Sequence, residues 1–240
     1  MNFQNRILRF LKKRIRVFLD FEFRDVSNII QRTPPSLIKK NKYNALMKEC
    51  DTVFIERLKY NKTALKLDYW KSHFELHGFE NFPEIHGHLL DFGCGSGHLD
   101  ILLARRGIKI TGIDASPIAI RICEYLKNKE TKEIASRLNF YEIDITQKKI
   151  LNIPVDSVWS TQVFEHIENP KPIIDGIRQY VKKGTYFLIC VPYGDAYDDP
   201  GHCNHFYSDK ELENFLSSHI NVRRVVVDYE FNVIRALCQF

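Results

Sequence analysis

Side chains that can carry acid–base chemistry gather in two stretches in the second half of the chain. Glu165 and His166 are adjacent, and His205 lies in a segment rich in His, Tyr and Asp that runs from 192 to 208. The unperturbed pKa of histidine lies near neutral pH, so His166 or His205 could act as a general base toward a substrate hydroxyl. The segment therefore predicts a site of proton transfer.

The same side chains allow two other interpretations. Glu165, His166 and His205 offer a carboxylate and two imidazoles, a set that can bind a divalent metal ion. Alternatively, the histidines only hold the loop by hydrogen bonds. Residue types alone leave the base, the metal ligand and the purely structural role open.

A glycine-rich segment stands upstream, between a short apolar run and a helical pattern. Its chemistry-bearing residues are Asp91, Gly93, Gly95 and Gly97. Glycine reaches backbone angles closed to other residues and lets a ligand approach the backbone. The helix that follows presents free N–H groups at its start. The segment predicts a site for a nucleotide-like ligand at the end of a strand.

Two more acids follow later apolar runs. Asp114 ends the run 108–113, where a carboxylate can accept hydrogen bonds from ribose hydroxyls. Asp144 ends the run 140–143. Taken singly, Asp114 could be only a helix N-cap, and Asp144 only a turn acid.

The glycine segment, written Asp91-x-Gly93-x-Gly95-x-Gly97, resembles the motif of class I S-adenosylmethionine-dependent methyltransferases. The resemblance covers about residues 68–240. A dinucleotide-binding fold would carry Gly-x-Gly-x-x-Gly, and here the third glycine falls one position early. An acid before the first glycine would repel a pyrophosphate. It favours a cationic sulfonium ligand that carries an amino group.

The resemblance implies S-adenosylmethionine as the methyl donor, with Asp114 at its ribose and Asp144 at its adenine amino group. The segment 158–167 is similar to the family's fourth-strand segment, although Gln162 stands where a glutamate is common. The donor-binding residues expected on this basis are Asp91, Gly93, Gly95, Gly97, Asp114, Ala115, Asp144, Ile145 and Thr161.

The resemblance also bears on the catalytic residues and the acceptor. Some members of the fold, the small-RNA 3′-end methyltransferases, bind a metal through carboxylate–histidine sets. We expect no metal here, with Glu165, His166 and His205 as the alternative. The expected reaction is O-methylation of a small-molecule, sugar or lipid-linked acceptor. The alternatives are an RNA-modifying methyltransferase and a non-catalytic partner protein that retains the fold.

The elements that must position these residues alternate between strand and helix from residue 88 onward. The two final strands lie close together with no helix between them, which requires an antiparallel pair. We therefore expect a Rossmann-like α/β fold whose seven-stranded sheet is mostly parallel with an antiparallel C-terminal strand, plus a helical N-terminal extension. The predicted strands are 89–92, 109–113, 138–143, 157–160, 186–191, 222–229 and 233–239.

Charge divides the chain into a basic front and a slightly acidic body. Residues 1–80 hold 17 Lys and Arg against 9 Asp and Glu, whereas the rest holds 18 against 21. We expect residues 1–67 to form a basic helical extension or lid and 68–240 the methyltransferase domain. An acidic body argues against nucleic acid as a partner.

An amphipathic pattern over residues 3–23 leaves three roles open. This helix could lie on an anionic membrane surface, form a lid or dimer element, or simply pack on the body. Six cysteines without a Cys-x-x-Cys pair indicate reduced thiols. With no apolar run of about 18 residues and no secretory pattern, we expect a cytoplasmic protein, with peripheral contact at the inner membrane face as an option.

Overall fold

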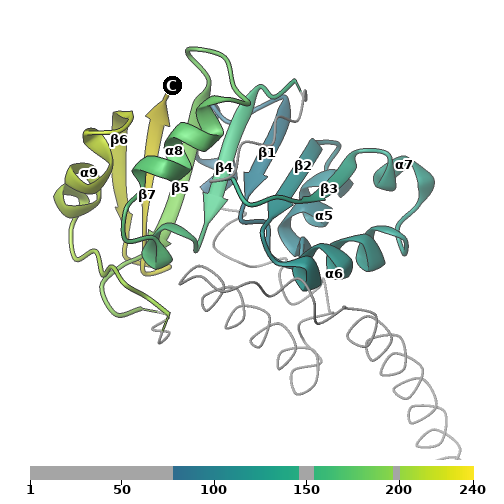
Figure 1. Ribbon diagram of the computed structural model, residues 1–240, viewed down its shortest axis with the longest axis horizontal. Coiled ribbons are helices and arrows are strands. Elements are labelled where there is room, and N and C mark those ends of the chain that lie inside the picture. The colour runs from purple at the N-terminus through teal and green to yellow at the C-terminus, as the bar shows by residue number, and fades with distance from the viewer. Residues whose placement is uncertain (1–77, 146–153, 197–200) are drawn as a thin grey trace, which may run out of the picture.

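The computed structural model describes residues 78–145, 154–196 and 201–240. Within them, seven strands form one sheet in the order β3-β2-β1-β4-β5-β7-β6 (Figure 1). Strands β1 to β6 run parallel, and β7 runs antiparallel to its neighbours β5 and β6. The predicted seven-stranded, mostly parallel Rossmann-like sheet with an antiparallel C-terminal strand is confirmed. The strands are β1 (His88–Phe92), β2 (Lys109–Asp114), β3 (Leu138–Glu142), β4 (Ser157–Thr161), β5 (Tyr186–Pro192), β6 (Asn221–Asp228) and β7 (Val233–Gln239).

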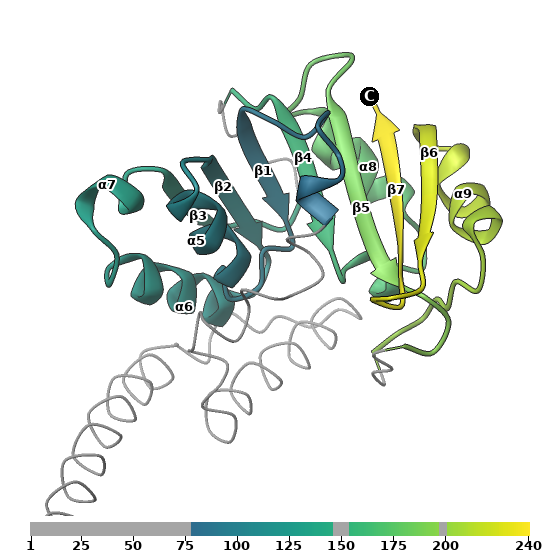
Figure 2. The same ribbon diagram turned by 180° about the vertical axis from the view of Figure 1, so that it is seen from behind.

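Both faces of the central strands are buried, which is why these strands are nearly continuous apolar runs. Alternation along β1 sends Leu90 and Phe92 to one face and Leu89 to the other. The first face packs against α8 (Lys171–Arg178) and α9 (Asp209–Ser217), the second against α5 (His98–Arg105) and α6 (Pro117–Lys127). Figures 1 and 2 show the sheet from its two sides, with the short helix α7 (Lys132–Ala135) beside β3.

Local capping fixes where the helices begin. The hydroxyl of Ser116 accepts a hydrogen bond from Ala119 N at 3.1 Å, and Pro117 opens α6. The hydroxyl of Ser208 caps α9 in the same way. The two caps therefore mark where the chain turns from the sheet into α6 and α9.

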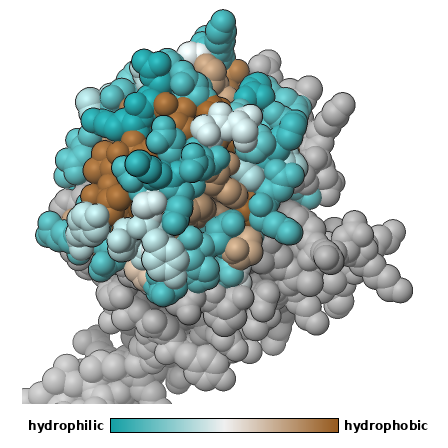
Figure 3. All heavy atoms as spheres, turned by 90° about the vertical axis from the view of Figure 1, so that its left-hand side faces the viewer, coloured by the Kyte–Doolittle hydropathy of each residue, from teal (hydrophilic) through white to brown (hydrophobic). Residues whose placement is uncertain are grey.

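The β6 side of the sheet is an open edge. Its outermost strand carries the exposed residues Arg223 and Arg224, and charged side chains on an edge strand oppose pairing with another chain. Figure 3, seen from this side, shows apolar patches interrupted by hydrophilic side chains. Among the described residues, no helix is long and apolar enough to cross a membrane.

Several expectations fall on other parts of the chain. The extension 1–67, its helix 3–23 and the boundary before residue 68 lie outside the described residues. The five cysteines that are described are free thiols, namely Cys94, Cys123, Cys190, Cys203 and Cys238.

Candidate active site

The carboxyl ends of β1 to β5 meet at one edge of the sheet, and the turn after β1 is built from glycine there. Gly93, Gly95 and Gly97 have φ of 75°, 53° and 69°, in the left-handed region that other residues rarely adopt. A Cβ atom on Gly93 would overlap Val163, and one on Gly97 would lie 2.8 Å from Cys123 Sγ. Backbone conformation and close packing therefore both require glycine in this turn.

Asp114, at the end of β2, braces the glycine turn. Its Oδ2 accepts a hydrogen bond from Gly95 N at 2.9 Å, and its Oδ1 accepts one from Ser116 N at 2.8 Å. The half-buried carboxylate thus joins the turn to the start of α6. A ligand that contacts this acid would therefore lie next to the glycine turn.

The remaining expected donor residues lie at the same edge. Ile143 N donates to Asp114 O at 2.9 Å, so the chain after β3 runs beside the end of β2. Asp144 is half-buried there and Ile145 is buried, while Ala115 follows β2 and Thr161 ends β4. The structure brings the whole predicted donor set to the ends of β1 to β4.

Asp91 and a residue that the sequence analysis missed, Asp100, form a buried acidic pair. Asp91 is 5% exposed and Asp100, in the first turn of α5, is 1% exposed. Burial raises the pKa of Asp91 to about 7, and burial together with the charge of Asp91 raises the pKa of Asp100 well above its usual range. Like charges in one apolar site oppose full ionisation of both.

The turn after β4 holds a strained residue and a buried acid. Gln162 has φ of 55°, in the left-handed region that non-glycine residues rarely adopt, and strained residues of this kind cluster at functional sites. Glu165, on the 3₁₀ helix η3 (Phe164–His166), is 1% exposed, and neither carboxyl oxygen has a hydrogen-bond partner within the described residues. Burial raises its pKa to about 8.

The histidine-rich segment is docked onto this turn. The backbone N–H groups of Cys203 and Asn204 donate to Glu165 O at 2.9 and 3.0 Å, and the Asn204 amide donates to Ile167 O at 2.7 Å. Four bonds of this kind, including one from Asn204 to Phe164 O, fix the segment against η3.

These hydrogen bonds bring His202 close to Glu165 and His166. The rings of His166 and His202 are 4.7 Å apart between centroids. His166 Nδ1 lies 2.9 Å from Gly201 O and therefore carries the proton, which leaves Nε2 facing Glu165 Oε1 at 4.0 Å. Each of Glu165, His166 and His202 offers one possible ligand atom, and these three atoms lie within 4.8 Å of one another.

His205 lies beside this cluster rather than in it. Its Nδ1 is 3.3 Å from Asp195 Oδ1, which also accepts a hydrogen bond from Tyr207 OH at 2.7 Å. Its ring centroid is 6.0 Å from that of His202. The acid–histidine set in the structure therefore differs from the expected trio, because His202 takes the place given to His205.

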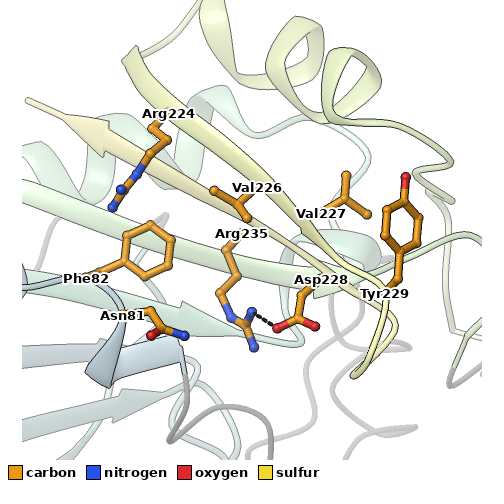
Figure 4. A pocket seen from close by; sticks show the side chains of 8 residues that line it. All are labelled: Asn81, Phe82, Arg224, Val226, Val227, Asp228, Tyr229 and Arg235. Carbon is orange, nitrogen blue, oxygen red and sulfur yellow. Dashed lines mark hydrogen bonds and ion pairs between the residues drawn. The ribbon is translucent and has the colours of Figure 1, made fainter.

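A separate hollow opens near the end of β6. Arg235 there is 2% exposed and forms an ion pair with Asp228 at 2.6 Å, while the Arg224 guanidinium lies over the Phe82 ring (Figure 4). Its strand residues come from β6 and β7, and strands β4 and β5 lie between these and β1, after which the glycine turn follows. Its lining residues are Asn81, Phe82, Arg224, Val226, Val227, Asp228, Tyr229 and Arg235.

Comparison with known proteins agrees with this architecture. The chain is 28% identical over 165 residues to the mitochondrial ubiquinone biosynthesis O-methyltransferase of Dictyostelium discoideum, covering 54% of this chain and 48% of that protein. It is 32% identical over 119 residues to the ubiquinone biosynthesis O-methyltransferase of Maricaulis maris, covering 50% and 44%. The chain thus spans about half the length of the curated relatives it matches.

A solved structure shows the same fold. The glycopeptide N-methyltransferase MtfA complexed with S-adenosyl-L-methionine superposes with a TM-score of 0.58 at 12% identity, covering 69% of this chain and 92% of that one. The sequence model of the methyltransferase domain matches residues 75–224. With that match across most of the chain and this fold, the protein belongs to the methyltransferase domain family.

Proposed function

We propose that the protein transfers the methyl group of S-adenosylmethionine to an oxygen of a small-molecule, sugar or lipid-linked acceptor. Support for the donor comes from the glycine turn, Asp91 and Asp114 at one edge of the sheet. Support for oxygen as the acceptor atom comes from the two relatives, which are both O-methyltransferases.

The residues at the edge fit a cationic donor. The glycines of the turn carry no side chain of their own, and Asp91 Oδ1 is buried with no hydrogen-bond partner among the described residues. A buried carboxyl of this kind gains from a positively charged group. When bound, the donor supplies a methyl group already activated by its positively charged sulfur, so the protein has to position the acceptor and remove a proton.

His205 is the residue that we assign to proton removal. Asp195 orients its imidazole through Nδ1, which leaves Nε2 to accept the hydroxyl proton as the acceptor oxygen bonds to the methyl carbon. The electrons of the carbon–sulfur bond remain on sulfur. His166, the other base candidate, has Nδ1 engaged by Gly201 and Nε2 turned to Glu165, so it belongs with the cluster.

Glu165, His166 and His202 fit a divalent cation. The fit rests on the Glu165 carboxyl, which is buried beside two imidazoles and has no hydrogen-bond partner in the described residues. A cation held there would orient the acceptor oxygen and favour its deprotonation. The observation that carries the proposal as a whole is the docking of segment 201–206 onto η3, which places these side chains at the same edge as the donor residues.

A labelled-methyl assay on the full chain tests this function. The protein is incubated with methyl-labelled S-adenosylmethionine and a panel of phenols, sugars, lipid-linked hydroxyl compounds and RNA. We expect label in an O-methyl group of a non-nucleic-acid acceptor. His205→Ala should lower kcat about 10²- to 10⁴-fold with the donor Kd unchanged.

His219→Ala is the matched control, because His219 follows α9 at the opposite edge of the sheet. It should keep wild-type turnover. Full turnover by His205→Ala would exclude His205 as the base. Label found only in RNA or on nitrogen would overturn the proposed acceptor.

A further inference from the structure

The acidic pair Asp91 and Asp100 has a feature that ion pairing does not explain. Asp91 Oδ1 and both oxygens of Asp100 are buried and have no hydrogen-bond partner among the described residues. Buried carboxyls without partners are costly, so they persist where a ligand or a shared proton satisfies them.

The sheet is shaped to bring the two acids together. Asp91 on β1 is the register partner of Gly112 on β2. A Cβ atom on Gly112 would lie 2.7 Å from Asp100 Oδ2, so the missing side chain leaves the room in which Asp100 reaches the sheet. Across the sheet, Trp159 on β4 is the other register partner of Asp91, and Phe140 on β3 is the partner of Gly112. Both are buried, and they enclose the acids in apolar surface.

The groups around the pair favour one retained proton. Those that act on it electrostatically are Asp114 on β2, Cys94 in the glycine turn and Cys123 on α6. Burial raises the pKa of both thiols, which stay neutral, and no cationic side chain of the described residues is among these groups. Asp100 is the more deeply buried acid, 1% exposed against 5% for Asp91, and both of its oxygens lack a partner among the described residues, so the shared proton stays on Asp100 and the hydrogen bond runs from Asp100 to the Asp91 carboxylate.

We propose that Asp100 is a positioning residue for donor binding: in its protonated form it donates a hydrogen bond to Asp91 and holds Asp91 as the carboxylate that binds the donor's ammonium group. The inference rests on the proposed S-adenosylmethionine binding. Asp91 touches the donor, and Asp100 acts through Asp91.

The arrangement makes donor binding depend on pH. Donor binding needs ionised Asp91, so affinity falls about tenfold per pH unit below the pKa of Asp91. That pKa is about 7 with Asp100 in place. Without the hydrogen bond from Asp100 the buried carboxylate is less stable, its pKa rises, and the loss of affinity begins at higher pH.

Calorimetric titration of the full chain tests the inference between pH 5.5 and 7.5. This range stays below the region, about pH 7.7 to 8.0, where the donor's own α-amino group titrates. Wild type and Asp100→Asn should show the same pH profile, because the amide also donates to Asp91. Asp100→Leu, of similar volume but with no donor, should bind at least about tenfold more weakly at pH 7, with its profile displaced to higher pH.

A second measurement does not depend on a variant. Titration of wild type at pH 6.5 in two buffers of different ionisation enthalpy should show release of between about half a proton and one proton per donor bound. S-adenosylhomocysteine keeps the ammonium group but has no positively charged sulfur, and it should show the same release.

The outcomes separate the inference from the proposed function. Absence of proton release, equal profiles for wild type and Asp100→Leu, or an Asp100→Asn variant as weak as Asp100→Leu would each overturn the inference. Proton release with S-adenosylmethionine alone would overturn the assignment to the ammonium group. If wild type bound no S-adenosylmethionine at any pH, the proposed function itself would fail.

Discussion

Replacing Gly97 by alanine tests how the glycine turn is built. Gly97 has φ of 69° and lies immediately before α5. The left-handed conformation costs a non-glycine residue about 1–2 kcal/mol. The new Cβ would also lie 2.8 Å from Cys123 Sγ and 3.1 Å from two ring carbons of Phe140. Overpacking of this kind costs about 1–3 kcal/mol, so we expect the free energy of unfolding to fall by about 2–5 kcal/mol.

Gly107→Ala is the matched control for the backbone contribution. Gly107 has φ of 94°, and a Cβ there would meet nothing within 4 Å. It precedes β2 at the edge opposite the glycine turn. Urea denaturation followed by circular dichroism should show a loss of only about 1–2 kcal/mol for this variant.

Donor binding gives a second comparison between the two alanine variants. Gly97→Ala should weaken S-adenosylmethionine binding because Cys123, Phe140 and the turn must shift, whereas Gly107→Ala should leave the Kd unchanged. Equal losses of stability in both variants would refute the close approach at Gly97. Unchanged donor binding by Gly97→Ala would refute the link between the shape of the turn and the donor.

Three further predictions concern buried charge. The folded-state pKa of Glu165, about 8, lies above its ordinary value of 4.5, so the protein should lose stability as pH rises through that interval. In the presence of a chelator, Glu165→Gln should remove this pH dependence of stability and raise the free energy of unfolding, measured by urea denaturation, by about 3 kcal/mol at pH 7. An unchanged pH dependence would contradict the burial assigned to Glu165. Mn²⁺ should raise the Tm of wild type but not of Glu165→Gln, and equal shifts would argue against the cation site. Asp228→Ala removes the carboxylate that pairs with Arg235, which is 2% exposed, and should cost about 3–5 kcal/mol in urea denaturation. Asp175→Ala, which removes the partner of exposed Lys171, should cost less than about 1 kcal/mol; similar losses would mean that burial does not control the effect.

The strands and the positions of the expected donor residues were predictable because both follow local rules. Apolar runs such as 186–191 predict a buried strand, and the structure has β5 at Tyr186–Pro192. The expected donor residues fall at strand ends, so the parallel sheet alone brings Asp91, Asp114 and Asp144 to one edge. Their roles in donor binding stay predictions.

The long-range contacts at the site were not predictable from spacing. His202 reaches Glu165 only because Cys203 and Asn204 form hydrogen bonds with the turn after β4, almost forty residues earlier in the chain. The sequence alone does not show whether His202 or His205 faces Glu165. Asp100 in a first helical turn is typical of an acid that complements the helix dipole. That Asp100 forms a buried pair with Asp91 is visible only in the structure, where Gly112 lies beside Asp91 and leaves room for the Asp100 carboxyl.

Titration of the full chain with S-adenosylmethionine tests the central claim most directly, comparing wild type with Asp114→Ala. We expect wild type to bind one donor per chain, with saturation. Removal of the carboxylate that braces Gly95 should weaken binding at least about tenfold. Absence of binding by wild type, or equal binding by the two proteins, would contradict the assignment of this edge of the sheet to the methyl donor.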